Sequence, residues 1–240
     1  GNSGTNAVTG VGFQPDFTWF KARSDTRSHS MVDSVRGFNG TSGRVIQSAS
    51  TNAEWESAYI NSLNSDGFTV SGSELYINNS SHNYVSWNWK ANGSGSANTV
   101  GDIDSTVSVN TDAGFSIISY TANGSSTATV GHGLSQTAEM VFTKRRDSSR
   151  NWHVGHKDLP FNSSSNSHHG YLSLNGTGAS DPSNGGRANI PNATTFQGEG
   201  SNNATMIAYC FHSVDGYSKM GSYTGNGNAD GTFVYTGFRP

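Results

Sequence analysis

A short segment in the second half of the chain holds the densest group of side chains suited to binding a ligand. It contains Arg150, Trp152, His153, His156 and Asp158. Sugar-binding sites combine these residue types, because an aromatic ring stacks on the sugar while charged groups bond to its hydroxyls. The segment also fits a strand in which the tryptophan is buried and the polar side chains face water. We take these five residues as the candidate ligand-binding residues.

Histidines are also common ligands of transition metals. His153 and His156 lie three positions apart, and the pair His168–His169 follows them. A metal site needs further Cys or carboxylate ligands at suitable spacing, and these histidines have none. Asp102 and Asp104 offer too few oxygens for Ca²⁺, which takes roughly six to eight. We therefore predict no bound metal and no cofactor.

Motifs of the common enzyme classes are absent from the sequence. It lacks the Gly-x-Ser-x-Gly elbow of serine hydrolases, the phosphate-binding loop ending in Gly-Lys-Ser/Thr, and the His-Glu-x-x-His zinc motif. A glycosidase places two carboxyl groups about 5–9 Å apart across a cleft. Glu54 and Glu56 occupy alternate positions of one surface segment, which does not form such a cleft. We predict that the protein is not an enzyme.

Basic residues recur at matched places in the two halves of the chain. Lys21 and Arg23 in the first half correspond to residues 144–146, Lys-Arg-Arg, in the second. This recurrence favours a structural role, in which the charges guard an exposed strand edge or pair with acids such as Asp25 and Asp147. Contact with an acidic surface polysaccharide is the alternative.

Composition limits the class of protein. Only 13% of the 240 residues are charged and the net charge is −3, so no basic field is available to hold nucleic-acid phosphates. Apolar residues make up 32%, but aromatics reach 11%, and their alternation with polar residues indicates a packed core between long polar loops. The single cysteine, Cys210, lies in an apolar run and is expected to be buried. No apolar run reaches the roughly 18 residues of a membrane helix.

The chain repeats itself. Residues 216–240 match two other segments. Residues 114–124 resemble the front half of residues 216–240, and residues 1–15 resemble the back half. A second internal repeat relates residues 84–90 to residues 206–212, which lie roughly half the chain later. Such a chain is expected to be part of a longer, modular protein. The predicted organisation has three parts. Residues 1–100 form a first module that lacks its opening strand, and residues 101–215 form a second module. Residues 216–240 form the opening strands of a third repeat or close onto the first module.

Short alternating segments between turn signals predict strands along most of the chain. In residues 85–89, one valine and two tryptophans alternate with polar residues, which is typical of a half-buried strand. Residues 74–77 and 171–174 are also predicted as strands, whereas irregular structure, a short helix or a bent strand would fit residues 51–63. Ser, Thr, Asn and Gly are poor helix formers. The predicted fold is therefore all-β, with antiparallel β-sandwich or jelly-roll modules in tandem.

Three phrases carry a family resemblance: GFQPDFTWFKAR in residues 12–23, IAYCFH in residues 207–212 and GYSKMGSYTGNG in residues 216–227. They resemble a repeat module of marine bacteriophages, found in tail-fibre and other virion-surface proteins of phages that infect cyanobacteria and related bacteria. The resemblance covers nearly the whole chain. It implies a domain of the concanavalin-like lectin type displayed on a virion, and it supplies no catalytic or sugar-binding residues.

The resemblance and the polar loops together lead us to expect a non-enzymatic structural and adhesive module of a phage tail fibre or virion appendage, located on the virion surface. Its expected partners are host cell-surface polysaccharide or glycoprotein, other copies of itself, as in a homotrimer, and other virion proteins. Neither nucleic acid nor membrane insertion is expected. Two alternatives stay open, namely an architectural spacer or capsid decoration, and a polysaccharide depolymerase.

Overall fold

The computed structural model describes residues 1–162, 168–180 and 191–239, and these residues form strands, turns and loops without a helix. The prediction of an all-β protein built from antiparallel sheets is confirmed. Its physical basis is the composition, since Ser, Thr, Asn and Gly disfavour helices while the alternating aromatic residues suit a half-buried sheet. Within these ranges, no helix is long and apolar enough to span a membrane.

The first large sheet is built from residues 17–89. Its strands, in spatial order, are β4 (Phe38–Asn39), β5 (Ser42–Gln47), β3 (Ser30–Asp33), β2 (Phe17–Ala22) and β9 (Tyr84–Trp89), with β6 (Trp55–Ser57) pairing on β5. A smaller sheet packs against its inner face, in the order β1 (Asn6–Val8), β8 (Gly67–Val70) and β7 (Ile60–Asn64). A core of buried apolar side chains joins the two sheets: Phe20, Val32, Val45, Ile60, Phe68, Val70 and Ile77.

The second large sheet is built from residues 96–211. Its spatial order is β10 (Ser96–Asn98), β11 (Ser105–Asn110), β12 (Phe115–Asn123), β19 (Asn202–Phe211), β14 (Met140–Arg145) and β15 (His153–His156). Two further strand pairs accompany it: β13 (Thr129–Gly131) with β18 (Thr195–Gln197), and β16 (Phe161–Asn162) with β17 (His168–His169). The inner face packs in a second core, which includes Ile118, Tyr120, Val130, Phe196 and Met206.

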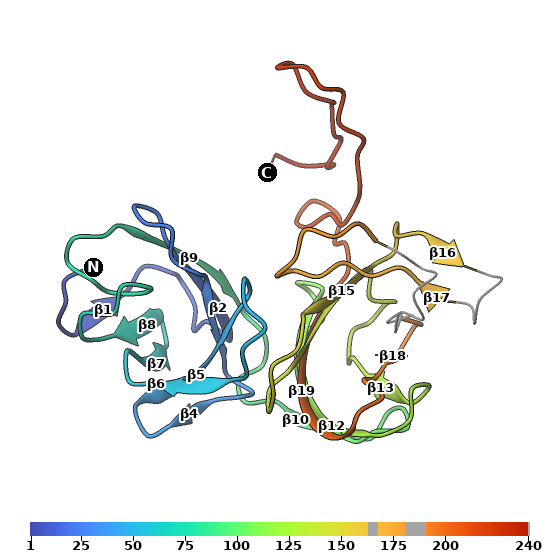
Figure 1. Ribbon diagram of the computed structural model, residues 1–240, viewed down its shortest axis with the longest axis horizontal. Coiled ribbons are helices and arrows are strands. Elements are labelled where there is room, and N and C mark those ends of the chain that lie inside the picture. The colour runs from blue at the N-terminus through green and yellow to red at the C-terminus, as the bar shows by residue number, and fades with distance from the viewer. Residues whose placement is uncertain (163–167, 181–190, 240) are drawn as a thin grey trace.

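The outer faces of the two large sheets pack against each other (Figure 1). This third core joins residues of the first sheet to residues of the second: Phe17, Met31, Ile46, Phe115, Ile117, Trp152, Ile207, Tyr209 and Phe211. The ring centroids of Phe17 and Tyr209 are 4.4 Å apart, and those of Phe17 and Phe115 are 6.0 Å apart. The two halves of the chain share this core. The predicted module boundary near residue 100 stays a prediction.

Buried charges connect the same two sheets. Arg36 Nε lies 2.5 Å from Asp33 Oδ2, which also accepts a hydrogen bond from Tyr209 Oη at 2.7 Å. Glu54 lies between two arginines, 3.1 Å from Arg36 Nη1 and 2.9 Å from Arg146 Nη2. Burial opposes the charge on Arg36, but the facing carboxylates outweigh it and raise the pKa of Arg36 above its usual value. Since each charge has a partner, the interface tolerates their burial.

Equivalent strands of the two halves occupy equivalent places in their sheets. Lys21 on β2 lies opposite Val85 on β9, and Lys144 on β14 lies opposite Ile207 on β19. Lys21, Lys144 and Arg145 therefore sit on central strands, and Arg23 and Arg146 directly follow those strands. The predicted edge-guarding role is wrong for Lys144, which is fully buried. Asp147 is an acid partner as predicted, since Arg145 Nε lies 2.5 Å from Asp147 Oδ1. The Asp25 carboxylate instead contacts Arg27 and His82, and Lys21 reaches Asp25 only at its backbone carbonyl oxygen.

Several local predictions are wrong for identifiable reasons. Residues 74–77 form a turn rather than a strand, because the Glu74 carbonyl oxygen accepts hydrogen bonds from the backbone of Ile77 and Asn78. Residues 51–63 form no helix: residues 51–54 are irregular, and the rest forms β6, a turn and most of β7, which comes nearest to the bent strand among the predicted alternatives. Residues 171–174 contribute only an isolated bridge.

Two further segments differ from what the sequence pattern predicts. Trp87 lies on the apolar side of its strand but is 45% exposed, because β9 is an edge strand. Residues 219–239 form no strand, although their sequence repeats strand-forming segments.

Candidate functional site

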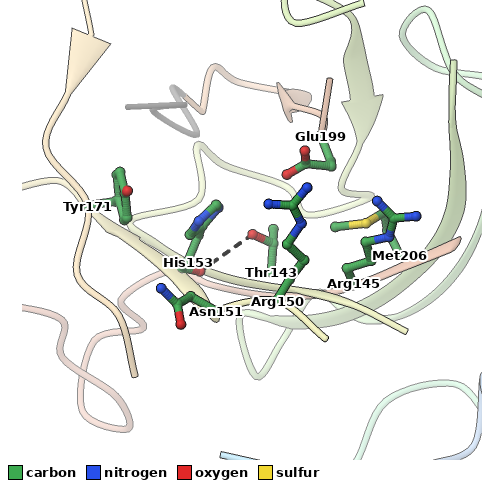
Figure 2. A pocket seen from close by; sticks show the side chains of 8 residues that line it. All are labelled: Thr143, Arg145, Arg150, Asn151, His153, Tyr171, Glu199 and Met206. Atoms are coloured by element: carbon green, nitrogen blue, oxygen red, sulfur yellow. Dashed lines mark hydrogen bonds between the residues drawn. The ribbon is translucent and has the colours of Figure 1, made fainter. Parts of the chain in front are cut away.

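A polar pocket of about 260 Å³ opens on the inner side of the second large sheet, next to its edge strand β15 (Figure 2). The lining comes from β14, β15, β19 and the loops around them: Thr143, Arg145, Arg150, Asn151, His153, Tyr171, Glu199 and Met206. A concave site with a few converging polar groups on a rigid sheet is the usual form of a ligand pocket.

Three paired strands hold the base of this pocket. Thr143 on β14 lies opposite His153 on β15, and Arg145 lies opposite Met206 on β19. Directly opposed side chains share a face of a sheet, so these four side chains meet on the inner side. Thr143 Oγ1 also donates a hydrogen bond to the carbonyl oxygen of His153 at 3.5 Å. Strand pairing therefore fixes their relative positions.

The rim carrying Arg150 and Asn151 is tied to two other parts of the chain. The backbone N–H of Arg150 donates to the carbonyl oxygen of Thr51 at 2.8 Å, and Thr51 belongs to the first half of the chain. Asn151 Oδ1 accepts a hydrogen bond from Asn175 Nδ2 at 2.9 Å. Contact between the two halves thus helps to shape the pocket.

The side chains around the opening provide an aromatic surface and several polar groups. The Tyr171 ring packs beside His153, with centroids 4.6 Å apart and an interplanar angle of 54°. Figure 2 shows the side chains of Arg145, Arg150 and His153 pointing to the same side, with Glu199 across from the arginines. The pocket therefore offers guanidinium donors, a carboxylate acceptor and a ring within one small space.

Arg145 already has an acidic partner within the chain. Burial alone would raise the pKa of Asp147, but the hydrogen bond from Arg145 and the backbone N–H of Thr205 hold that pKa below its usual value. The side chains of Arg145 and Asp147 are 22% and 34% exposed, so solvent screens their attraction. The pair holds the Arg145 guanidinium in a defined place at the pocket wall.

The structure separates the five candidate residues into three groups. Arg150 and His153 line the pocket. Trp152 is fully buried between the two large sheets, where its Nε1 donates to a carbonyl oxygen of the first sheet at 2.8 Å. His156 is the last residue of β15 and Asp158 lies just beyond it, with His156 Nδ1 and Asp158 Oδ2 3.9 Å apart. Alternation explains why Trp152 and His153 are separated, because neighbouring side chains of an extended segment point to opposite faces.

The same alternation bears on the histidines considered as metal ligands. His153 and His156 are an odd number of residues apart on β15, so their side chains project from opposite faces of the sheet. The side chains of His168–His169 lie outside the described residues. Among the side chains that the structure does describe, no group of three or more His, Cys, Asp or Glu could hold a metal ion.

Sequence reasoning missed Tyr171 and Glu199 as pocket residues. Each comes from a loop distant in sequence from β15, and no local motif marks it. Tyr171 reaches the pocket because its neighbour Leu172 forms a bridge with Val154, with both backbone N–H···O distances below 3.0 Å. The predicted strand at residues 171–174 is the only sequence feature that could have indicated the place of Tyr171, because a strand there would also lie beside β15.

The first half of the chain has a groove at the matching place. Ser30 on β3 lies opposite Phe20, as His153 lies opposite Thr143 in the second sheet. The groove beside Ser30 has a volume of about 400 Å³ and is rich in aromatic and acidic side chains: Trp55, Glu56, Tyr59, Glu74 and Tyr76. Trp55 and Tyr59 are 37% and 40% exposed, so their rings are available to a ligand.

Comparison with known proteins identifies the family. No curated protein and no solved structure matches the chain. The family model described as "Domain of unknown function (DUF7483)" matches residues 1–240, which is the entire sequence. The chain is therefore a member of the DUF7483 family.

Proposed function

We propose that this chain is a non-enzymatic adhesive module that binds a glycan in the pocket beside β15. The observation that carries the proposal is the Tyr171 ring, packed on His153 within the same small pocket as Arg145 and Arg150. An aromatic ring gives a sugar a flat apolar surface, and the guanidinium groups donate to its hydroxyl or carboxylate oxygens. The second sheet and the Thr51 contact hold these groups in place before the ligand arrives.

A second groove increases the strength that such a module can reach. The exposed rings of Trp55 and Tyr59 suit another unit of the same polysaccharide or a second chain of it. A single exposed sugar pocket binds weakly, but two sites on one rigid body raise the effective concentration of the second contact. Repetition of the module would multiply this effect.

The resemblance to phage virion modules supports a wider proposal about place and partners. The module belongs to a tail fibre or other virion appendage, has a lectin-like sandwich architecture, and meets host cell-surface polysaccharide or glycoprotein. Other virion proteins and further copies of the chain are its structural partners. A purely architectural spacer or decoration is the alternative, and it requires no ligand at either groove.

Glycan binding is tested by titrating the chain with oligosaccharides from bacterial surface polysaccharides, in a neutral series and a uronic-acid series. Tyr171→Ala and Arg150→Ala should each weaken binding about tenfold, which corresponds to about 1.4 kcal/mol. Tyr235→Ala and Arg27→Ala change the same residue types far from the pocket and should leave affinity unchanged. Failure of both series to bind would reject the adhesive role and favour the architectural one.

Depolymerase activity is checked with the same ligands. Glu56 and Glu74 line the groove of the first half, and each is hydrogen bonded within the chain, Glu56 Oε2 to Asn39 Nδ2 at 2.9 Å and Glu74 Oε1 to the Tyr76 backbone at 3.2 Å. Incubation with host polysaccharide should produce neither new reducing ends nor unsaturated uronates. Appearance of either product, lost in Glu56→Gln and Glu74→Gln, would show an enzyme instead.

A further inference from the structure

The groove beside β6 in the first half of the chain differs in charge from the pocket beside β15. It has a volume of about 400 Å³, and none of the described residues that line it is basic. Three aromatic rings and two carboxyl groups belong to its lining: Trp55, Tyr59, Tyr76, Glu56 and Glu74. The pocket beside β15 has two arginines and a single glutamate. The two cavities therefore suit ligand groups of opposite charge.

The three rings of the groove have no aromatic neighbour. In the part of the chain that the structure describes, each of the other four tryptophans has a ring partner, as Trp89 has in Phe17, with centroids 5.0 Å apart. Trp55, Tyr59 and Tyr76 have no such partner there. Trp55 and Tyr59 are also 37% and 40% exposed. Rings that are not packed on one another leave faces on which a ligand can stack.

The surrounding chain holds these rings in place. Trp55 on β6 lies opposite Val45 on β5, so it shares a face of the sheet with a fully buried core residue. The Tyr59 ring lies over the backbone of Gly72, where an added Cβ would come within 2.8 Å of the ring atoms Cδ1 and Cε1. The rings are therefore in position before a ligand arrives, which reduces the entropic cost of binding.

The polar atoms of the same rings have no partner within the described chain. The hydrogen bonds of Tyr59 and Tyr76 are made by their backbone groups, so neither phenol oxygen is bonded. The indole Nε1 of Trp55 is also unbonded, whereas that of Trp152 donates to the carbonyl oxygen of Gln47 at 2.8 Å. These three atoms are not among the buried ones without a partner. They can pair with the hydroxyl groups of a sugar.

Glu74 supplies a negative charge next to these rings. Its Oε1 accepts a hydrogen bond from the backbone N–H of Tyr76 at 3.2 Å, which holds the carboxylate at the turn that carries this ring. Within the described residues its Oε2 has no partner, and neither Glu74 nor Glu56 forms an ion pair. Glu54, by contrast, lies between two arginines. A carboxylate and aromatic faces both attract a cation, so the groove favours a positively charged ligand.

We propose that this groove binds a sugar unit that carries a free amino group. The sugar ring stacks on the exposed ring of Trp55, and the ammonium group donates to the Glu74 carboxylate. A quaternary ammonium head group fits less well, because it has no N–H to donate to Glu74 and too few hydroxyls for the three ring atoms. The inference rests on the proposed function in taking the ligand to be a polysaccharide, and it adds that this polysaccharide contains amino sugars.

Two tetrasaccharides test the charge of the ligand, by titration calorimetry of the full chain in mildly acidic buffer, where a sugar amine carries a proton. One consists of glucosamine and the other of N-acetylglucosamine, which has the same ring with the amine acetylated and neutral. The glucosamine tetrasaccharide should bind about tenfold more tightly. Glu74→Gln should remove this preference and leave the affinity for the acetylated ligand unchanged, which also shows that the variant is folded. Asp104→Asn, an exposed acid of the second half, is the matched control and should keep the preference.

Tryptophan emission locates the bound sugar. Stacking on Trp55 should change the emission of the chain during the titration, and Trp55→Phe should abolish that change. Trp87→Phe is the matched control, because Trp87 is 45% exposed but lies on β9, outside the groove. A chain with Arg150→Ala and Tyr171→Ala has lost two side chains of the pocket beside β15. Binding of the glucosamine tetrasaccharide that survives in this chain belongs to the groove.

The outcomes separate the groove from the pocket beside β15. Suppose that neutral and uronic-acid sugars fail to bind, while the glucosamine tetrasaccharide binds and depends on Glu74 and Trp55. The pocket is then rejected as a sugar site, and the amino-sugar assignment of the groove stands. If neutral or uronic-acid sugars bind in the pocket but the two tetrasaccharides bind equally or not at all, the assignment of the groove is overturned and the pocket stands.

Two further results would overturn the assignment. Loss of both tetrasaccharides in Glu74→Gln would mean that Glu74 supports the shape of the groove and does not select a charge. Choline carries a cation without a sugar ring, and we expect it to bind at least about tenfold more weakly than the glucosamine tetrasaccharide. Equal affinity for choline would replace the amino sugar with a quaternary ammonium head group.

Discussion

Replacing Lys144 with methionine should remove a pH dependence of stability that the native chain shows in mildly alkaline solution. Lys144 lies on the central strand β14 and is fully buried. Its Nζ donates to the carbonyl oxygens of Arg145 at 2.7 Å and of Thr51 at 3.3 Å, so it also joins the two halves. Burial lowers the pKa of Lys144 from 10.5 to about 8, and Asp147 only partly opposes that effect.

The direction of the effect follows from the protons bound in each state. Between pH 8 and 10.5 the unfolded chain keeps a proton on Lys144 that the folded chain has lost, so the free energy of unfolding rises with pH. A pKa difference of about 2.5 units corresponds to about 3 kcal/mol in total. About 2 kcal/mol of this falls between pH 7.5 and 9.5. Above pH 10 the effect of Tyr209 is opposite, because burial raises its pKa.

Urea unfolding at pH 7.5, 8.5 and 9.5 measures this slope for the native chain, for Lys144→Met and for Lys90→Met. Lys90 is exposed and controls for the loss of one positive charge. We expect the free energy of unfolding of the native chain to rise by about 2 kcal/mol relative to Lys144→Met across this window, with Lys90→Met parallel to the native chain. Parallel curves for the native chain and Lys144→Met would refute the argument that burial lowers this pKa.

Three further substitutions test the packing. Glu54→Gln should lower the free energy of unfolding by about 3 kcal/mol in thermal and urea unfolding, because it leaves the fully buried Arg36 and the partly buried Arg146 without their shared carboxylate; an unchanged midpoint would contradict this. Trp152→Phe should cost about 1–3 kcal/mol, since a buried carbonyl loses its donor, and circular dichroism should show an intact fold. Gly67→Ala should destabilise by about 3 kcal/mol or more, because the residue has a φ of 145° and its Cβ would meet the Val8 carbonyl oxygen at 2.0 Å. Expression of a folded Gly67→Ala protein with the native melting temperature would reject that contact.

Much of the strand pattern is predictable because alternation is a local property. Residues 85–89 and their counterparts 207–211 form strands at equivalent places in the two sheets, as their shared pattern predicts. The turn at residues 74–77 is harder to predict, because it depends on hydrogen bonds to the Glu74 carbonyl rather than on hydrophobicity. The exposure of Trp87 depends on which strands are neighbours, and spacing along the chain contains no such information.

The candidate site was predictable only in part for the same reason. Arg150 and His153 share a short segment, so their proximity could be inferred from sequence. Tyr171 and Glu199 reach the pocket through long-range pairing that no local motif records. Trp152 was ambiguous between ligand binding and the core, and the third core between the two sheets explains its burial.

Comparison of the two halves separates structural from functional positions. Lys21 and Lys144 are retained, and in both the ammonium group bonds to backbone carbonyl oxygens, so this position serves the sheet itself. Ser30 and His153 differ although they hold the same place in their sheets. A difference at an equivalent place, beside two pockets with different linings, is expected when each pocket binds its own ligand unit on a common scaffold. Replacing His153 with serine, the residue at the equivalent place in the first sheet, should therefore alter glycan preference while leaving the folded structure intact, since His153 is only partly buried and lies outside the three cores.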